Sequence, residues 1–158
     1  MPRVDHYQDP DAPRPNSLVP AASVVVVQDG KVLMHRRRDT DRWSIPGGGM
    51  EPGESIKDTA IREAREETGY DVEVDRLVGV FSDPGHVVAF DDGEVRQQFS
   101  VCFAGHVVGG SPRLSDETRE VGWHEPGALR SMTDAQLHPS ILLRIEVALR
   151  KDEAAYIG

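Results

Sequence analysis

Residues 48–70 read GGMEPGESIKDTAIREAREETGY, and this stretch decides the fold of the chain. It opens on glycines, which do not sustain a helix, and then shows the signals of a helix start. Ser55 is a favourable N-cap residue, and Asp58 stands three residues later, where a capping box has its second member. Gly69 is a favourable C-cap residue. These signals predict a helix over Ser55–Thr68 that is entered directly from a glycine-rich loop.

Three carboxylates gather on one side of the predicted helix. Glu63, Glu66 and Glu67 are three and four positions apart, and residues so spaced are neighbours on a helix surface. Clustered carboxylates repel one another, and ligand sets made only of oxygen are those that Mg²⁺ and Mn²⁺ prefer. The alternative is a solvated helix on which Arg62 and Glu66 form an ordinary i,i+4 pair.

The spacing around these carboxylates favours the metal site. Seven identities stand in register: Gly48, then Glu54 after five residues, then Arg62 and Glu63 after seven more, then Glu66, Glu67 and Gly69. At ordinary residue usage, such a pattern arises by chance on the order of 10⁻⁸ per window. The segment resembles the Nudix box, the signature of the Nudix hydrolase family, at all seven invariant positions. The departures are Ala64 and Tyr70, which replace aliphatic residues of the signature.

The resemblance implies a fold and a reaction. The fold would be α/β, a Nudix-type α/β/α sandwich with a mixed β-sheet. The reaction would be the metal-dependent cleavage of a phosphoanhydride bond. Glu63, Glu66 and Glu67 would bind Mg²⁺ or Mn²⁺, and one of them would serve as the base.

The resemblance also implies supporting residues around the carboxylates. The carbonyl of Gly47, just before the box, would be a further metal ligand. Arg62 would hold neighbouring glutamates in place by pairing with Glu54. Gly48, in the glycine-rich loop, is a candidate substrate contact, because such a backbone can approach a ligand closely.

A later loop offers one more acidic candidate. Members of the family often take an additional ligand or general base from such a loop, and Glu117 and Glu120 are the candidates here. We favour Glu120 because it immediately precedes the predicted strand Val121–Trp123. A plain charged turn is the open alternative.

Four residues outside the box are candidate substrate contacts. Arg36, in a run of three arginines, suits bidentate contact with a phosphate, and Trp43 could stack on a base. Pro84 lies about fifteen residues past the box, which resembles the ADP-ribose-hydrolysing members, and His86 shares its loop. Ordinary solvated or packing roles are the alternative for each of them.

Hydrophobic patterns outside the box predict further strands and a division of the chain into an arm, a domain and a tail. Ser23–Val27 predicts a strand buried on both faces. Val95–Val108 alternates, which predicts one core face and one face on a more polar cavity or surface. We expect an N-terminal arm with little regular structure (residues 1–17), a Nudix domain (18–152) and a C-terminal tail (153–158).

Composition limits the cellular compartment and the classes of partner that we expect. The formal net charge of −9 argues against a nucleic-acid coat, because phosphate backbones require a basic surface. The single cysteine, Cys102, excludes a disulfide framework or a cysteine-based zinc cluster and indicates a cytoplasmic setting. No stretch is long enough to span a membrane. We expect a small-molecule nucleotide as partner, and a homodimer is an arrangement that the arm would suit.

Three hypotheses for function follow. The first is a pyrophosphohydrolase acting on a nucleoside diphosphate linked to another group, with ADP-ribose-like compounds and nucleoside triphosphates as the two substrate candidates. The second is a Nudix domain that senses a nucleotide without cutting it, which the intact box argues against. The third is an interaction protein with an acidic surface, which leaves the spacing from Gly48 to Gly69 unexplained.

Overall fold

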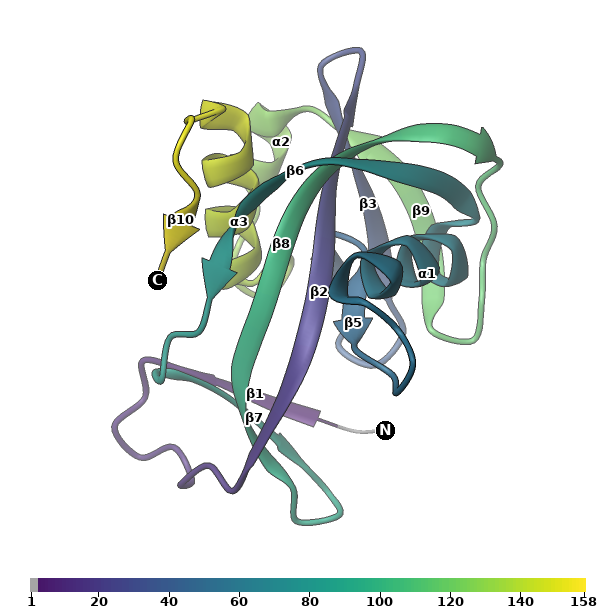
Figure 1. The fold of residues 1–158 in the computed structure, drawn as a ribbon. Coiled ribbons are helices and arrows are strands. Elements are labelled where there is room, and N and C mark those ends of the chain that lie inside the picture. Colours follow the sequence, from purple (N-terminus) through teal and green to yellow (C-terminus); the bar gives the residue numbers. More distant parts are fainter. Residues whose placement is uncertain (1–2) are drawn as a thin grey trace.

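A computed structural model describes residues 3–158, which form one mixed sheet with helices on both of its faces (Figure 1). The strands are β1 (Arg3–Tyr7), β2 (Ser17–Gln28), β3 (Lys31–Arg37), β4 (Trp43–Ser44), β5 (Gly47–Gly49), β6 (Tyr70–Phe81), β7 (His86–Phe90), β8 (Val95–Gly110), β9 (Thr118–His124) and β10 (Tyr156–Ile157). The helices are α1 (Ile56–Thr68), α2 (Pro126–Arg130) and α3 (Pro139–Arg150). None of the helices in residues 3–158 combines the length and the apolar character needed to cross a membrane.

The long strand β2 lies at the centre of the sheet. It pairs in parallel with β8, whereas β3 and β5 pair with it antiparallel. The β5 strand is the glycine-rich loop itself, and its register against β2 sets Gly47 opposite Ser23. The glycine-rich loop is therefore held by the sheet before the chain enters α1.

Two hydrophobic clusters cover the two faces of the sheet. Successive valines of β2 alternate between them: Val25 packs with Ile145 of α3, and Val24 packs with Ala60 and Ala64 of α1. This alternation is what a strand buried on both faces requires. The expected α/β/α sandwich with a mixed sheet is confirmed.

Helix α1 begins and ends at the predicted residues. The Ser55 hydroxyl accepts from the Asp58 N–H, and the Asp58 carboxylate accepts from the Ser55 N–H, so the capping box is complete. Gly69 ends the helix with a φ of 85°, in the left-handed region that favours glycine. The ends of α1 therefore follow from local sequence alone.

The strand predicted over Val95–Val108 is present as β8, and its polar-facing side changes along its length. Gln98 and Ser100 line a cavity, as expected. Cys102, two residues further on the same face, is fully buried in the cluster beneath α3. The helix α3 covers this part of the face, so the prediction of a polar cavity or surface is wrong at Cys102.

The expectation of an irregular N-terminal arm is wrong for Arg3–Tyr7. These residues form β1, an antiparallel partner of β7 in which Tyr7 lies opposite His86. The pairing satisfies backbone groups through a partner some eighty residues away in sequence, so local composition could not reveal it. The C-terminal residues also join the sheet, because β10 pairs in parallel with β6.

Candidate metal centre and substrate cavities

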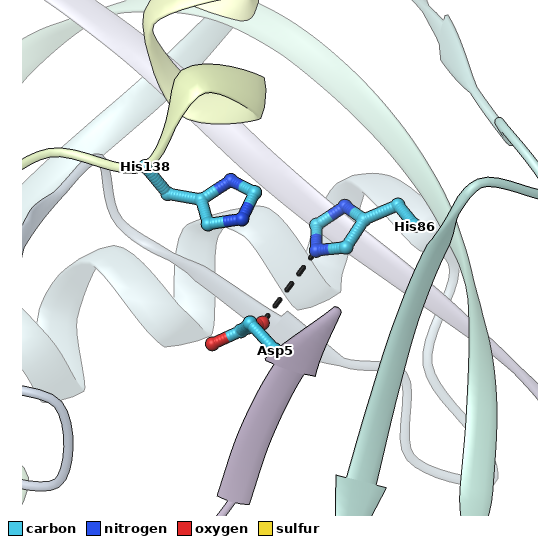
Figure 2. Close-up of side chains that lie close together, drawn as sticks. All are labelled: Asp5, His86 and His138. Atoms are coloured by element: carbon cyan, nitrogen blue, oxygen red, sulfur yellow. Dashed lines mark ion pairs between the residues drawn. The ribbon is translucent and has the colours of Figure 1, made fainter. Parts of the chain in front are cut away.

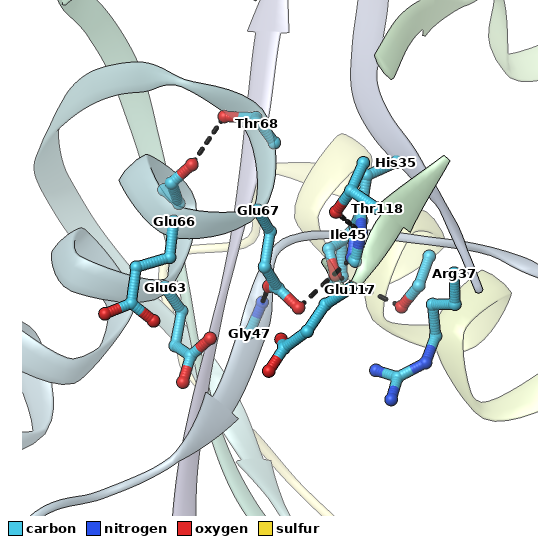
Figure 3. A network of polar contacts seen from close by, with 12 residues as sticks. His35, Arg37, Ile45, Gly47, Glu63, Glu66, Glu67, Thr68, Glu117 and Thr118 are labelled. Carbon is cyan, nitrogen blue, oxygen red and sulfur yellow. Dashed lines mark hydrogen bonds and ion pairs between the residues drawn. The ribbon is translucent and has the colours of Figure 1, made fainter. Parts of the chain in front are cut away.

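Three carboxylates converge beside the glycine-rich loop (Figure 3). Glu63 and Glu67 project from α1, and Glu117 projects from the loop before β9. Each offers an oxygen, and these oxygens lie within 4.8 Å of one another. Glu66 differs, because its side chain is 55% exposed and its Oε2 accepts from Arg62 Nη1 at 3.1 Å. The structure thus groups two of the three box carboxylates predicted as ligands with a third from outside the box.

Arg62 ties the glutamates to the loop. Its Nε donates to Glu54 Oε2 at 2.5 Å, which confirms the predicted pair. Its Nη2 donates to the carbonyl of Gly49 at 3.0 Å, and its Nη1 donates to Glu63 Oε1 at 3.0 Å. The hydrogen bond from Arg62, with one from the Glu51 backbone N–H, lowers the pKa of Glu54 to about 2. Arg62 and Glu54 are therefore both charged at neutral pH, and Arg62 also holds the Glu63 carboxylate.

The glycine-rich loop approaches the carboxylates through its backbone. The Gly47 N–H donates to Glu67 Oε1 at 2.7 Å. A Cβ placed on Gly48 would lie 2.5 Å from Glu63 Oε1, closer than real side chains come. A side chain at position 48 would therefore have to displace the Glu63 carboxylate.

Without a bound cation, burial and mutual repulsion disfavour the ionised form of the clustered carboxylates. Burial raises the pKa of Glu67 well above its ordinary value, and the charge of Glu63 adds to this effect. Burial likewise raises the pKa of Glu63 to about 7, although Arg62 opposes the rise. Burial lowers the pKa of His35 to about 4. The approach of His35 Nε2 to Glu67 Oε2 at 3.6 Å is therefore a contact with a neutral ring and not an ion pair.

The donor set fits a hard divalent cation. The converging atoms are carboxylate oxygens, which Mg²⁺ and Mn²⁺ prefer. A cation among them would offset the mutual repulsion and the burial that raise the pKa values of Glu63 and Glu67. These two side chains, with Glu117, are the residues that would hold it.

Glu117, and not Glu120, reaches the cluster. Glu120 Oε1 instead accepts from Arg36 Nη1 at 3.0 Å on the exposed side of the β3–β9 pair. The register of that pair shifts between Arg36 and Arg37, where an extra residue of β9 stands opposite the step. The strand β9 begins at Thr118 and not at Val121, so Glu117 is the residue that precedes it and Glu120 lies within it.

Three adjoining cavities extend from the carboxylates. The carboxylate cavity, of about 620 Å³, is bordered by Glu63, Glu67, Glu117, Gly47–Gly49 and Arg37. The central cavity, of about 100 Å³, shares Gly47, Gly48, Arg3, Arg37 and Gln98 with it. The aromatic cavity, of about 310 Å³, is lined by Tyr7, Phe81, Pro84 and Tyr156, and it shares His86, Gln98, Ser140 and Arg144 with the central cavity. A bound molecule can thus extend from the carboxylates toward α3.

The candidate substrate contacts distribute unevenly over these cavities. Trp43 and Gly48 line the central cavity, and Pro84 and His86 line the aromatic one. Arg36 lines none of the three, since its guanidinium is engaged by Asp41 and Glu120.

The sequence did not single out three cavity residues: Asp5, His138 and Arg144. They come from β1, from the N-cap of α3 and from the middle of α3. One signal was available for Arg144, because an arginine on the apolar side of an amphipathic helix is unusual.

Comparison with known proteins establishes the family. The family model for the NUDIX domain matches residues 17–144. The chain therefore belongs to the Nudix family. It superposes on a NUDIX hydrolase from Nitrosomonas europaea with a TM-score of 0.71 and 25% identity, covering 85% of this chain and 90% of that one.

Two curated relatives are similar over the same region. A MutT-like protein of Streptomyces ambofaciens is 37% identical over 108 residues, which cover 68% of this chain and 64% of the relative. An ADP-ribose pyrophosphatase of Methanocaldococcus jannaschii is 32% identical over 113 residues, which cover 65% of this chain and 60% of the relative. The chain thus spans somewhat less than two thirds of the length of these relatives.

Proposed function

We propose that this protein is a metal-dependent pyrophosphohydrolase that cleaves a phosphoanhydride bond in a nucleoside diphosphate linked to another group. The observation that carries the proposal is the convergence of Glu63, Glu67 and Glu117 within 4.8 Å, at the border of a cavity large enough for a diphosphate. Membership of the Nudix family and the name of the Methanocaldococcus jannaschii relative support this reaction class.

The chain's own residues divide the work of the reaction. Mg²⁺ or Mn²⁺ would supply charge neutralisation for the phosphate oxygens and a more acidic water. Glu63, Glu67 and Glu117 would hold the cations, and the carbonyl of Gly47 is proposed as a further ligand. Arg62 positions Glu63 by the contact at 3.0 Å. Glu66, at the exposed edge of the cluster, keeps its proposed role as a ligand to a more exposed ion.

The general base comes from the same group of carboxylates. Glu117 takes the place in this proposal that the sequence favoured for Glu120, because it faces the site and Glu120 does not. A carboxylate beside the attacking water accepts its proton, and the in-line attack on phosphorus then expels the leaving phosphate.

ADP-ribose-like compounds and nucleoside triphosphates are the two proposed substrate classes. Both present a diphosphate to the carboxylate cavity and a nucleoside that the aromatic cavity could enclose, since Tyr7, Phe81 and Tyr156 line it. Aromatic rings give planar bases a stacking surface.

A phosphate-release screen tests the proposal. The panel holds nucleoside triphosphates, ADP-ribose, other nucleotide sugars, dinucleoside polyphosphates and dinucleotide cofactors, each with Mg²⁺ and with Mn²⁺. We expect one preferred substrate whose turnover requires the metal and is lost in Glu67→Gln. A blank panel with saturable nucleotide binding would instead support the non-catalytic sensing domain.

A further inference from the structure

Arg144 is a buried cation that has no carboxylate partner among residues 3–158. It lies on α3, is 5% exposed, and faces both the central and the aromatic cavities. Its Nε has no hydrogen-bond partner among residues 3–158. Its guanidinium carbon lies 5.5 Å from the centroid of the Phe81 ring, a cation–π contact that compensates the charge only in part. Buried charges are normally paired, so this one calls for an anion from outside the chain.

The wall of the central cavity carries excess positive charge. Four arginines line it: Arg3, Arg37, Arg42 and Arg144. The carboxylate of Asp5 binds Arg3 at 2.8 Å and approaches Arg42 at 3.6 Å, and Arg37 pairs with Asp39. Two carboxylates thus face four guanidinium groups. The cavity suits a ligand that brings negative charge.

Two stacked histidines add hydrogen-bond donors to the same wall (Figure 2). The rings of His86 and His138 stack with centroids 4.8 Å apart. His138 Nδ1 accepts from the Ser140 N–H at 3.1 Å. Burial lowers the pKa of His138 to about 4, so the ring is neutral at pH 7 and carries its proton on Nε2. His86 Nε2 is buried, approaches Asp5 Oδ1 at 3.5 Å (Figure 2) and makes no full hydrogen bond with residues 3–158. The wall therefore offers N–H groups to an acceptor.

A metal ion is the competing occupant of this wall. Asp5, His86 and His138 bring ligand-type atoms within 4.8 Å of one another. Two contacts oppose a cation: both oxygens of Asp5 already accept from Arg3, and the tautomer of His138 leaves no lone pair on Nε2. The guanidinium groups nearby would also repel it. An anion meets none of these obstacles, and the charge of Asp5, which would oppose it, is already offset by Arg3 and Arg42.

We propose that the cavity between β1, β7 and the start of α3 is an anion subsite that holds a phosphate group, with Arg144 as its principal contact and His86 and His138 as further donors. Arginine presents a planar fork of N–H groups that matches phosphate oxygens. The central cavity, of about 100 Å³, has room for a single phosphate group. Its contact residues lie on other elements than the carboxylate cluster and give it the opposite charge, although the two cavities share Gly47 and Gly48.

The subsite deepens the proposed function, on which its use in catalysis rests. The central and carboxylate cavities share Gly47 and Gly48, so one extended substrate can occupy both. The preferred substrate then carries a phosphate beyond the two that flank the scissile bond, as a nucleoside triphosphate does and ADP-ribose does not. A free phosphate ion acting as an effector is the second source of the same chemistry.

Phosphate binding tests the subsite without reference to activity. The metal-free protein in EDTA is titrated with inorganic phosphate, and binding is followed by calorimetry and by the rise in Tm. Arg144→Met removes the charge at similar length, and removal of an unpaired buried charge is not expected to prevent folding. Arg144→Gln replaces it should the methionine variant fail to fold. Arg130→Met, at an exposed arginine of α2 paired with Glu146, is the matched control.

We expect saturable phosphate binding in the wild type, in Arg130→Met and in Glu67→Gln, and its loss in the Arg144 variants. Absence of binding in the wild type, or its persistence without Arg144, would overturn the subsite. A metal site would replace the anion subsite under one result. In that result the Glu67→Gln protein binds Zn²⁺, the binding requires His86 but not Arg144, and the protein shows no response to phosphate.

Kinetics with a substrate from the screen then distinguishes the source of the phosphate. Competitive inhibition by phosphate, with about a tenfold or greater rise in KM in Arg144→Met, assigns the subsite to the substrate. A change of kcat by phosphate at unchanged KM assigns it to a free effector. If the chain hydrolyses nothing, the calorimetric result still decides the subsite, so the two proposals fail separately.

Discussion

Glu63→Gln is predicted to change stability and activity in opposite directions. The replacement removes the charge but keeps an oxygen for the hydrogen bond from Arg62, which is 3.0 Å long in the wild type. In the ion-free protein the Glu63 carboxylate is buried beside Glu67, and its pKa rises from an ordinary 4.5 to about 7. The folded state therefore disfavours the ionised form of this side chain. Glutamine lacks that form and avoids its cost.

The size of the effect follows from the same pKa. A group with a raised folded pKa weakens the fold once it ionises, so its cost appears as pH rises from 4.5 and is complete above 7. At 1.36 kcal/mol for each tenfold change in proton affinity, the full cost is about 3 kcal/mol. We expect Glu63→Gln in EDTA to be more stable than the wild type by up to this amount at pH 8, with little difference at pH 4.

Urea unfolding followed by tryptophan fluorescence measures the stability of the protein in EDTA and in Mg²⁺. In EDTA at pH 8 the variant should unfold at the higher urea concentration. In Mg²⁺ the wild type should gain stability, because the ion binds only the folded protein, whereas Glu63→Gln should gain much less and turn over substrate orders of magnitude more slowly. Glu51→Gln, at a side chain 66% exposed, should change neither property. A variant less stable than the wild type in EDTA, with an undiminished Mg²⁺ response, would refute this reasoning.

Three further outcomes are expected. Gly48→Ala should lower kcat at least about tenfold with Mg²⁺, because its Cβ would stand 2.5 Å from the Glu63 carboxylate and displace it; steady-state kinetics measures this. Glu117→Gln should lower kcat far more than Glu120→Gln, and equal losses would contradict the assignment of Glu117. Gly69→Ala should destabilise the protein by about 1–3 kcal/mol in urea unfolding, since its φ is 85° and its Cβ would meet a backbone oxygen at 2.2 Å.

The parts of the structure that local sequence determines were predictable. The ends of α1 depend on Ser55, Asp58 and Gly69, which act within a single turn of the helix. The pair between Arg62 and Glu54 follows from the family resemblance and is present. The buried central strand β2 follows from its run of valines, although Val27 at its end is 41% exposed. In each case the partners are close in sequence or the hydrophobic pattern is strong.

The errors arose where a partner is distant in sequence. The polar segment Arg3–Tyr7 carries no pattern that predicts β7 as its partner. An edge strand is held mainly by backbone hydrogen bonds to its neighbour and needs few apolar side chains. The preference for Glu120 over Glu117 rested on a strand that starts at Val121, whereas the pairing with β3 continues past an irregularity to Thr118 opposite Arg37. A bulge depends on how two strands fit together, so neither strand encodes it alone.

Distance along the sequence also explains why the Nudix box predicts the reaction better than the substrate preference. Two of the carboxylates that would hold the metal, Glu63 and Glu67, share one helix, and their spacing of four residues is visible in the sequence. The wall of the central cavity is assembled from Asp5, His86, His138 and Arg144, which lie on three separate segments and show no common period. Their significance becomes visible only once folding buries the charge of Arg144 with no carboxylate partner in the described part of the chain, and charge balance is a property of the folded cavity. Substrate preference in this chain is therefore to be sought in the cavity wall and not in the signature.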